Sequence, residues 1–213
     1  RPDPEGGYEL VAGHRRHRAS ELAEKETMPV IVRNLDDDAA TIIMVDSNLQ
    51  RESLLPSERA FAYKMKLDAM KHQGERTDLT SGQLVQKLLS VEKVAEGTGE
   101  SYKNVQRYIR LTELIPELLD MVDTGQIKFN PAVELSYLAS EEQKDFLSAM
   151  DYAQAAPSLS QAQRIKKLAQ EGECTLDAMC EIMNEIKKGE LDRVTFKTDS
   201  LRKYFPKSYT NKQ

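Results

Sequence analysis

The chain has 213 residues, of which 39% are hydrophobic and 31% charged, a composition typical of a globular protein with one large or two modest domains. No apolar run approaches membrane-spanning length and nothing resembles a signal peptide. The net charge of −5 and the isoelectric point of about 5.4 exclude a generally basic nucleic-acid coat, so nucleic-acid contact would need a local patch. Because the chain begins at Arg1 without a methionine, we expect a piece of a longer protein.

The first segment predicts a strand and then a helix. "GGYELVAG" places Tyr8, Leu10 and Ala12 on one face, as alternation in a short strand does. Gly13 closes this strand, and a helix is expected over about 14–25.

A second strand and two longer helices follow. "PVIVRNL" is rich in β-branched residues and predicts the strand. The next helix, over 36–50, carries three aspartates at its N-terminal end, where a cap explains them better than a metal cluster does. A long amphipathic helix begins at Pro56. Its inner side is expected to carry Phe61, Met65 and Leu67.

The remainder of the chain predicts helices only, after a polar, turn-rich boundary over 71–82. The expected helices are 82–88, 90–97, 101–111, 115–123, 131–138, 141–154, 158–170 and 175–188, with Ser140, Ser160 and Thr175 at or near N-caps. Cys174 and Cys180, on roughly opposite faces of the last helix and with no metal motif, are expected to be small buried side chains in a reducing cytosol. In the tail we expect a short strand, followed by a basic, aromatic-containing segment. The fold class is therefore mostly α, with a small α/β N-terminal domain before an all-α domain.

"VEKVAEGTGESYKNVQRYIRL" has the spacing of a helix-turn-helix. Ala95 permits close packing of two helices, Gly99 supplies the turn, and Val105 and Ile109 anchor the second helix. A helical wheel places Tyr102 on the same inner side as these anchors.

The opposite face of this second helix is cationic and rich in amides. It carries Lys103, Gln106, Arg107 and Arg110. Arginine and lysine suit phosphates and guanine, and glutamine and asparagine suit adenine, so the face suits DNA. An ordinary helical hairpin with a solvated charged face is the alternative. Three nearby glutamates nearly cancel the local charge, so strong binding would need a dimer or a further anchor.

"GHRRHRAS" places cations in the first turn of a helix, where the helix dipole favours acidic side chains. Arg15, Arg18, Ala19 and Leu22 share one face, which is expected to point inward. Two explanations remain open. The guanidinium groups form an anion site with the helix amides, best suited to phosphates, or they pair with a carboxylate such as Asp46 or Glu52.

Three of these segments together resemble the ParB family of chromosome and plasmid partition proteins. "GHRRHRA" is similar to the family's GERR-x-RA phosphate motif, and "SNLQRESLLPSE" to its E-N-x-Q-R-x-x-L-x-P-x-E box. "AEGTGESYKNVQRYIRL" is similar to its A-x4-G-x-S recognition segment, and the order and spacing agree over roughly residues 7–120.

The resemblance implies an N-terminal domain that binds CTP with magnesium and a helical domain that recognises a palindromic, centromere-like site on double-stranded DNA. It implies a ParB-like nucleotide-binding α/β domain over 1–78 with its upstream part missing, an all-α helix-turn-helix domain over 79–190, and a C-terminal extension over 191–213. The implied nucleotide-binding residues are Gly13, His14, Arg15, Arg16, Asn48, Gln50 and Arg51, with Asn48 also at the metal. The implied DNA-binding residues are Ser101, Tyr102, Lys103, Asn104, Gln106 and Arg107, to which the cationic face adds Arg110.

Two positions depart from the family pattern. His14 replaces a glutamate of the first motif, and Ser47 replaces the glutamate before Asn48. A serine hydroxyl is a weaker ligand than a carboxylate for a hard cation, and Asp46 points about 100° away on a helix. CTPase activity, implied by the resemblance, is therefore expected to be weak or absent even where the nucleotide binds.

Three functional hypotheses follow. The first is a partition protein of ParB type, a cytoplasmic, nucleoid-associated homodimer that closes into a nucleotide-dependent clamp and works with a ParA-type ATPase, without membrane contact. The second is a transcriptional or nucleoid-occlusion regulator with a degenerate nucleotide pocket. The third is an enzyme, since related domains resemble sulfiredoxin or nucleases. His14 stands where sulfiredoxin chemistry needs a cysteine, and no orienting partner is visible for His14 or His17 as an acid or base.

Overall fold

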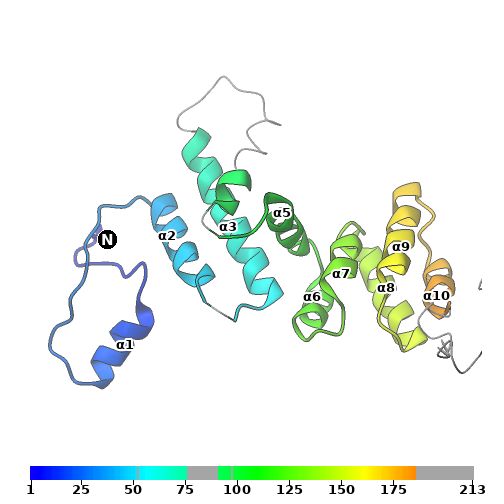
Figure 1. Cartoon of the computed structure of the whole chain (residues 1–213), viewed down its shortest axis with the longest axis horizontal. Coiled ribbons are helices and arrows are strands. Elements are labelled where there is room, and N and C mark those ends of the chain that lie inside the picture. Colours follow the sequence, from blue (N-terminus) through cyan, green and yellow to red (C-terminus); the bar gives the residue numbers. More distant parts are fainter. Residues whose placement is uncertain (52, 76–90, 97, 186–213) are drawn as a thin grey trace, which may run out of the picture. The chain divides into compact units, whose positions relative to one another are not determined.

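The computed structural model describes residues 1–51, 53–75, 91–96 and 98–185. Its labelled helices are α1 (His14–Leu22), α2 (Asp37–Leu49), α3 (Pro56–Glu75), α5 (Tyr102–Leu111), α6 (Pro116–Asp123), α7 (Phe129–Leu135), α8 (Ser140–Ala153), α9 (Leu159–Glu171) and α10 (Leu176–Asn184) (Figure 1). Residues 91–95 are helical as well. The mostly helical class is confirmed. No helix in the described ranges is long and apolar enough to span a bilayer.

The two short strands expected before α2 are not formed. Over the described residues, the only β pairing outside helices is an isolated bridge between Pro2 and Tyr8. Glu9 donates its backbone N–H to the Arg1 carbonyl at 2.8 Å, so the first nine residues close on themselves as a turn. Ile31, in the second expected strand, is 84% exposed. An alternating or β-branched pattern shows which side chains favour a sheet, but a strand forms only beside a partner strand.

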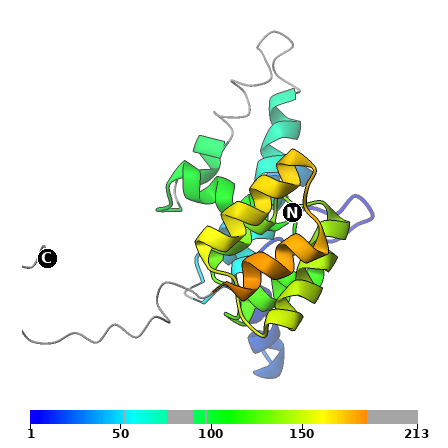
Figure 2. The ribbon, with the colours of Figure 1, turned by 90° about the vertical axis from the view of Figure 1, so that its right-hand side faces the viewer.

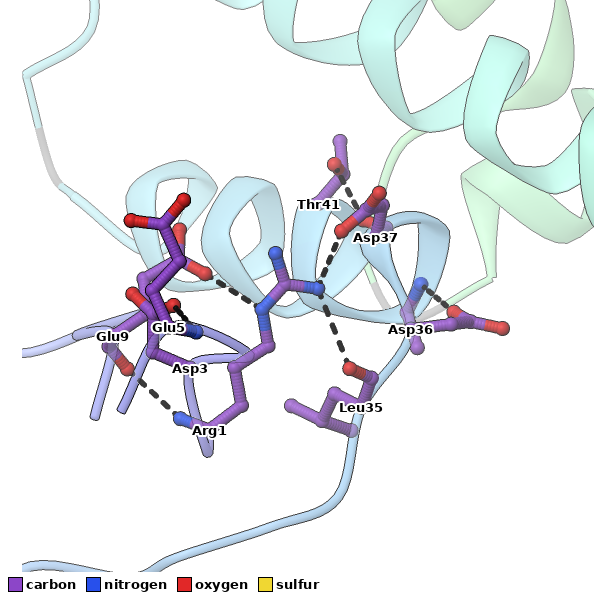
Figure 3. A network of polar contacts seen from close by, with 9 residues as sticks. Arg1, Asp3, Glu5, Glu9, Leu35, Asp36, Asp37 and Thr41 are labelled. Atoms are coloured by element: carbon purple, nitrogen blue, oxygen red, sulfur yellow. Dashed lines mark hydrogen bonds and ion pairs between the residues drawn. The ribbon is translucent and has the colours of Figure 1, made fainter. Parts of the chain in front are cut away.

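The start of α2 is stabilised by its own aspartates and by the N-terminal residue (Figure 3). Asp36 caps the helix, since its side chain accepts the Ala39 N–H at 2.8 Å. The Arg1 guanidinium contacts Asp37 and Glu9, each at 2.6 Å, and donates to the Leu35 carbonyl at 3.3 Å. The aspartate run is therefore a capping feature. The described residues contain no group of three or more His, Cys, Asp or Glu placed to hold a metal ion.

Helix α3 begins at Pro56 as expected but has a different inner face. Leu67 is buried, whereas Phe61 and Met65 are 51% and 48% exposed. The buried positions are Ala60, Tyr63, Lys66, Leu67 and Ala69. Lys66 is buried on this face and pairs with Asp46 at 2.6 Å, a placement that hydrophobicity alone does not indicate. The helix also continues to Glu75, so the first part of the expected boundary is helical. The boundary from residue 76 and the helix over 82–88 lie outside the described residues, as do the tail elements. The division into domains at residues 78 and 190 stays a prediction.

Two apolar clusters hold α3 and the helices from α5 to α10 together. The larger joins α6 to α10 with the end of α5, through side chains such as Leu111, Leu118, Phe146, Ile165 and Met179. The smaller joins α3 to the helix-turn-helix segment, through Tyr63, Leu67, Val91, Val94 and Val105. Tyr108 packs against both clusters, with its ring 5.8 Å from that of Tyr63 and 4.6 Å from that of Phe129.

Two buried glutamines close the polar gaps between helices. Gln143 accepts the Ile115 N–H at 2.8 Å and donates to two carbonyls, those of Glu113 and Leu138. Gln161 donates to the Ile182 carbonyl at 2.8 Å, which ties α9 to α10 where Figure 2 shows them side by side.

The expected helix caps are correct in part. Thr175 accepts the Ala178 N–H with its side chain, as expected. Ser140 is the first residue of α8. For α9, the cap is Ser158 rather than Ser160, because Ser158 and Gln161 form a reciprocal capping box.

Cys174 and Cys180 are both partly buried against the larger cluster, although Cys174 precedes α10 rather than lying on it. Burial raises the pKa of the Cys174 thiol to about 11, and the carboxylates of Glu142 and Asp145 add to the shift.

Candidate functional site: a cationic cavity and a helix-turn-helix

The N-terminus of α1 presents uncapped backbone amides beside two arginines. Gly13 precedes the helix with φ of +96°, a left-handed conformation that glycine adopts without strain. The first turn contains no acidic residue, and no side chain caps it. A Cβ on Gly13 would lie 3.3 Å from Arg16 Nη2, so the absence of a side chain lets this guanidinium fold back over the helix start.

The apolar-face interpretation of α1 is wrong. The helix buries none of its residues, and Leu22 is 71% exposed. A nine-residue helix with so many cations has little apolar surface to bury. The face shared by Arg15, Arg18 and Leu22 is therefore exposed to solvent and does not pack against the core. Arg18 pairs with Glu21 of its own helix at 3.0 Å.

Pairing of the cluster with Asp46 does not occur, since Asp46 pairs with Lys66 at 2.6 Å. Glu52 lies outside the described residues. Within those residues, neither Arg15 nor Arg16 has a carboxylate at ion-pair distance. A guanidinium group without an internal counter-charge is available to an external anion.

The arginines line a cavity of about 690 Å³ between α1, α2 and α3. Six of the seven nucleotide-binding residues expected from the sequence meet there, namely Gly13, His14, Arg15, Arg16, Asn48 and Arg51. Ser47 lines the same cavity. Gln50 does not, and instead lines a second, polar cavity of about 290 Å³ beside Asp46 and Lys66.

Sequence reasoning missed part of the larger cavity's wall. Glu58, Phe61 and Met65 line it from α3, on the face that the wheel had assigned to the core. The glutamate at the end of the "LLPSE" segment was the available signal. Glu58 Oε2 accepts the Leu55 N–H at 3.0 Å, which fixes the start of α3. The cavity thus combines a cationic end, an amide, a carboxylate and an apolar wall, a lining that suits a ligand with both a phosphate and an apolar part.

The residues present fit an anion better than they fit a metal ion. The unpaired guanidinium groups and the free amides of α1 suit phosphate. For Mg²⁺, the cavity offers the Asn48 amide, the Ser47 hydroxyl and the Glu58 carboxylate, so phosphate and water oxygens would have to complete an octahedral set.

The helix-turn-helix is formed as predicted in the described residues. Residues 91–95 are helical, Gly99 turns the chain with φ of +74°, and Ser101 caps α5 by accepting the Asn104 N–H at 3.3 Å. Val105 is fully buried and Ile109 partly buried. Tyr102 is 36% exposed and lies outside the core, contrary to the wheel, because it is the first residue of the helix.

The cationic face of α5 is accessible at its centre and occupied at its C-terminal end. Lys103, Gln106 and Arg107 are exposed, as are Ser101 and Tyr102. Arg110 is committed to α7: it donates to the Ser136 carbonyl at 2.7 Å, and its guanidinium lies 4.2 Å from the centre of the Tyr137 ring.

Two residues of α7 contact Arg107 and so extend the exposed face of α5 beyond the segment that the sequence indicated. Arg107 Nη2 donates to Asn130 Oδ1 at 2.7 Å, and its guanidinium lies 5.6 Å from the centre of the Phe129 ring. Local spacing gave no signal for these contacts, since 22 and 23 positions separate the partners.

Comparison with known proteins gives a consistent result. Residues 1–49 match the model of the ParB N-terminal domain. The chromosome-partitioning protein Spo0J of Thermus thermophilus is 34% identical over 140 residues, which are 65% of this chain and 45% of that protein. The nucleoid occlusion protein of Listeria monocytogenes is 35% identical over 137 residues, 64% of this chain and 42% of that protein. This chain therefore spans less than half the length of these relatives.

A solved structure is also similar. The C-terminally truncated chromosome-partitioning protein ParB from Caulobacter crescentus, complexed to the centromeric parS site, matches with a TM-score of 0.50 and 27% identity, over 80% of this chain and 79% of that chain.

Proposed function

We propose that this chain, a homologue of the ParB chromosome-partitioning proteins, is a sequence-specific DNA-binding protein that acts in chromosome or plasmid partition. One observation carries the proposal most directly. The capped helix α5 presents Lys103, Gln106 and Arg107 on one exposed face while Val105 anchors the other face in the core. A helix fixed in this way, with cations and an amide exposed, suits insertion into the major groove.

The proposed nucleotide is CTP, bound with its phosphates at the N-terminus of α1. Gly13, Arg15 and Arg16 would hold the phosphates, and Asn48 would contact the accompanying Mg²⁺. The unpaired guanidinium groups and the cavity of about 690 Å³ support this assignment. Gln50 is left out of the proposed contacts because it lines the other cavity.

We further propose a homodimer, because a palindromic DNA site requires two copies of α5 related by a two-fold axis. Association with the nucleoid follows from DNA binding, and a ParA-type ATPase is the proposed partner in partition.

A regulatory or nucleoid-occlusion role is the second candidate. Ser47 favours this role, because it stands where the family has a glutamate. A site without that carboxylate suits nucleotide binding without turnover. Measurement of CTP turnover with the cognate DNA present separates the two roles. Phosphate release supports a partition cycle, and tight DNA binding without release supports the regulator.

The DNA-binding proposal is tested with Arg107→Ala, which should weaken binding to a selected DNA site by about tenfold or more, in line with one lost base or phosphate contact. Lys167→Ala is the matched control, because Lys167 is an exposed cation on α9 whose ion-pair partner among the described residues is Glu171 of its own helix. Equal binding by the two variants would contradict the assignment of α5.

A further inference from the structure

Glu100, in the turn before α5, is held between two elements. Arg59 Nη1 of α3 contacts Glu100 Oε1 at 2.8 Å, and the side-chain amide of Asn104 on α5 donates to Glu100 Oε2. Both members of the Arg59–Glu100 pair are largely buried, with side chains 27% and 21% exposed. The carboxylate therefore uses one oxygen for each partner.

This contact fixes which way the Asn104 amide points. An ionised carboxylate only accepts hydrogen bonds, so the amide nitrogen must face Glu100 and the carbonyl oxygen must face away. A bidentate contact to adenine needs that oxygen to accept from N6 and a remaining amide hydrogen to donate to N7. An asparagine without such a partner populates both amide orientations, and only one of them suits the base.

Arg59 makes the arrangement compatible with DNA. A lone carboxylate at the start of a DNA-facing helix would repel phosphates, and Arg59 neutralises it. The Arg59 guanidinium also lies 5.4 Å from the centre of the Tyr108 ring, on α5 itself, which restricts where the cation can move.

We propose that Arg59 and Glu100 are positioning residues for base recognition, which orient the Asn104 side chain toward an adenine. The inference rests on the proposed function, because it assumes that α5 contacts DNA. Asn104 is the residue that touches the base, and Glu100 and Arg59 act through it. The specificity of this helix-turn-helix thereby depends on a residue of α3, 45 positions before Asn104.

The experiment determines the base preference of the whole chain at every position of its DNA site, by selection from a random duplex library. Wild type, Asn104→Ala, Glu100→Ala and the double variant are compared. We expect Asn104→Ala to lose preference for one base pair per half-site by about fivefold or more. Glu100→Ala should lose preference at the same base pair, and the double variant should lose no more than Asn104→Ala does.

Glu113→Ala is the matched control. Glu113 also contacts a lysine of α3, Lys64, at 3.6 Å, and its removal changes the net charge equally, but it does not contact Asn104. The control should keep the wild-type base preference. Melting temperatures of all variants establish that the fold is retained, and a merely structural role of Glu100 would weaken binding at all positions alike.

The outcomes are distinguishable. If wild type selects no DNA sequence, the proposed function fails and this inference fails with it. If wild type selects a site but Glu100→Ala keeps the preference that Asn104→Ala loses, the positioning role alone is overturned. It is equally overturned if Asn104→Ala changes no base preference.

Discussion

Arg15 and Arg16 have no carboxylate at ion-pair distance in the described part of the chain, unlike several other cations there. Arg59, Lys66 and Lys166 each contact a carboxylate at 2.6 to 2.8 Å, and these ion pairs join separate segments of the chain. The two arginines of α1 instead line a cavity without such a partner there. Cations at this end of α1 are repelled by the positive end of the helix dipole. A bound anion would offset this repulsion, since the amides and the guanidinium groups would then bind it together.

Arg16→Ala is expected to reduce CTP binding by about tenfold or more, because it removes a charge-assisted hydrogen bond. The melting temperature without nucleotide should change little, since this side chain makes no ion pair among the described residues. Isothermal titration calorimetry with CTP provides the measurement. Arg18→Ala is the control, because Arg18 pairs with Glu21 and does not line the cavity. Equal losses of CTP affinity in the two variants would contradict the assignment of this cavity as the nucleotide site.

Cys174 is expected to resist alkylation in the folded protein. Burial raises the pKa of its thiol to about 11, so at pH 8 only about one molecule in a thousand carries the reactive thiolate. Mass spectrometry after iodoacetamide treatment should find Cys174 unmodified in the native protein and modified after unfolding. Rapid native modification would show that the segment before α10 is not packed as described.

At the scale of elements, the two buried glutamines, Gln143 and Gln161, hydrogen-bond backbone groups that would otherwise lack partners between helices. Gln143 satisfies one N–H and two carbonyls from the segments before α6 and α8, in a position that is 1% exposed. No apolar side chain of the same size would satisfy these groups.

Gln143→Ala is therefore expected to lower the free energy of unfolding by about 3 kcal/mol, since three buried polar groups lose their partner. Urea unfolding followed by circular dichroism measures the change. Gln163→Ala, at an exposed position of α9, should change it by less than about 0.5 kcal/mol. A similar small effect at Gln143 would mean that water replaces its hydrogen bonds.

Helices were predictable from the sequence, whereas their faces were predictable only in part. Asp36, Pro56, Ser101 and Thr175 mark helix starts by local chemistry, and local chemistry is visible in a sequence. The inner face of α3 was not predictable, because the buried ion pair of Lys66 depends on a partner in another helix. The prediction of two strands was wrong for the same reason, because a β-strand is stabilised by hydrogen bonds to another segment of the chain.

The candidate site followed the same rule. The cluster of Arg15 and Arg16 and the recognition segment were identifiable as motifs. Their surroundings were identifiable only in part: Glu58 of the cavity ends the quoted "LLPSE" segment, whereas Asn130 beside Arg107 comes from a segment with no local signal.

For the molecule as a whole, α3 contacts both candidate sites, on two of its faces. Glu58, Phe61 and Met65 line the cavity, while Arg59 and Tyr63 contact the helix-turn-helix and its anchors. Helix α3 therefore contacts both the cavity and α5. Because the net charge is −5, the proposed attraction to DNA requires a local surface and not the whole molecule.

If the proposed DNA binding uses phosphate contacts by α5, DNA affinity should fall steeply with salt while base preference persists. When the logarithm of the binding constant is plotted against the logarithm of the salt concentration, each neutralised phosphate is expected to contribute about −0.9 to the slope. Fluorescence anisotropy with a selected duplex across a salt series gives this slope, and Lys103→Ala should reduce its magnitude by about one contact. A slope near zero would contradict phosphate contact by α5.

The central claim, a partition protein that recognises a specific DNA site, is tested most directly by footprinting the protein across the genome that encodes it. The account predicts a small number of palindromic sites clustered in one region, with occupancy lost in Arg107→Ala. Occupancy spread over promoters, or over DNA without any shared sequence, would contradict it.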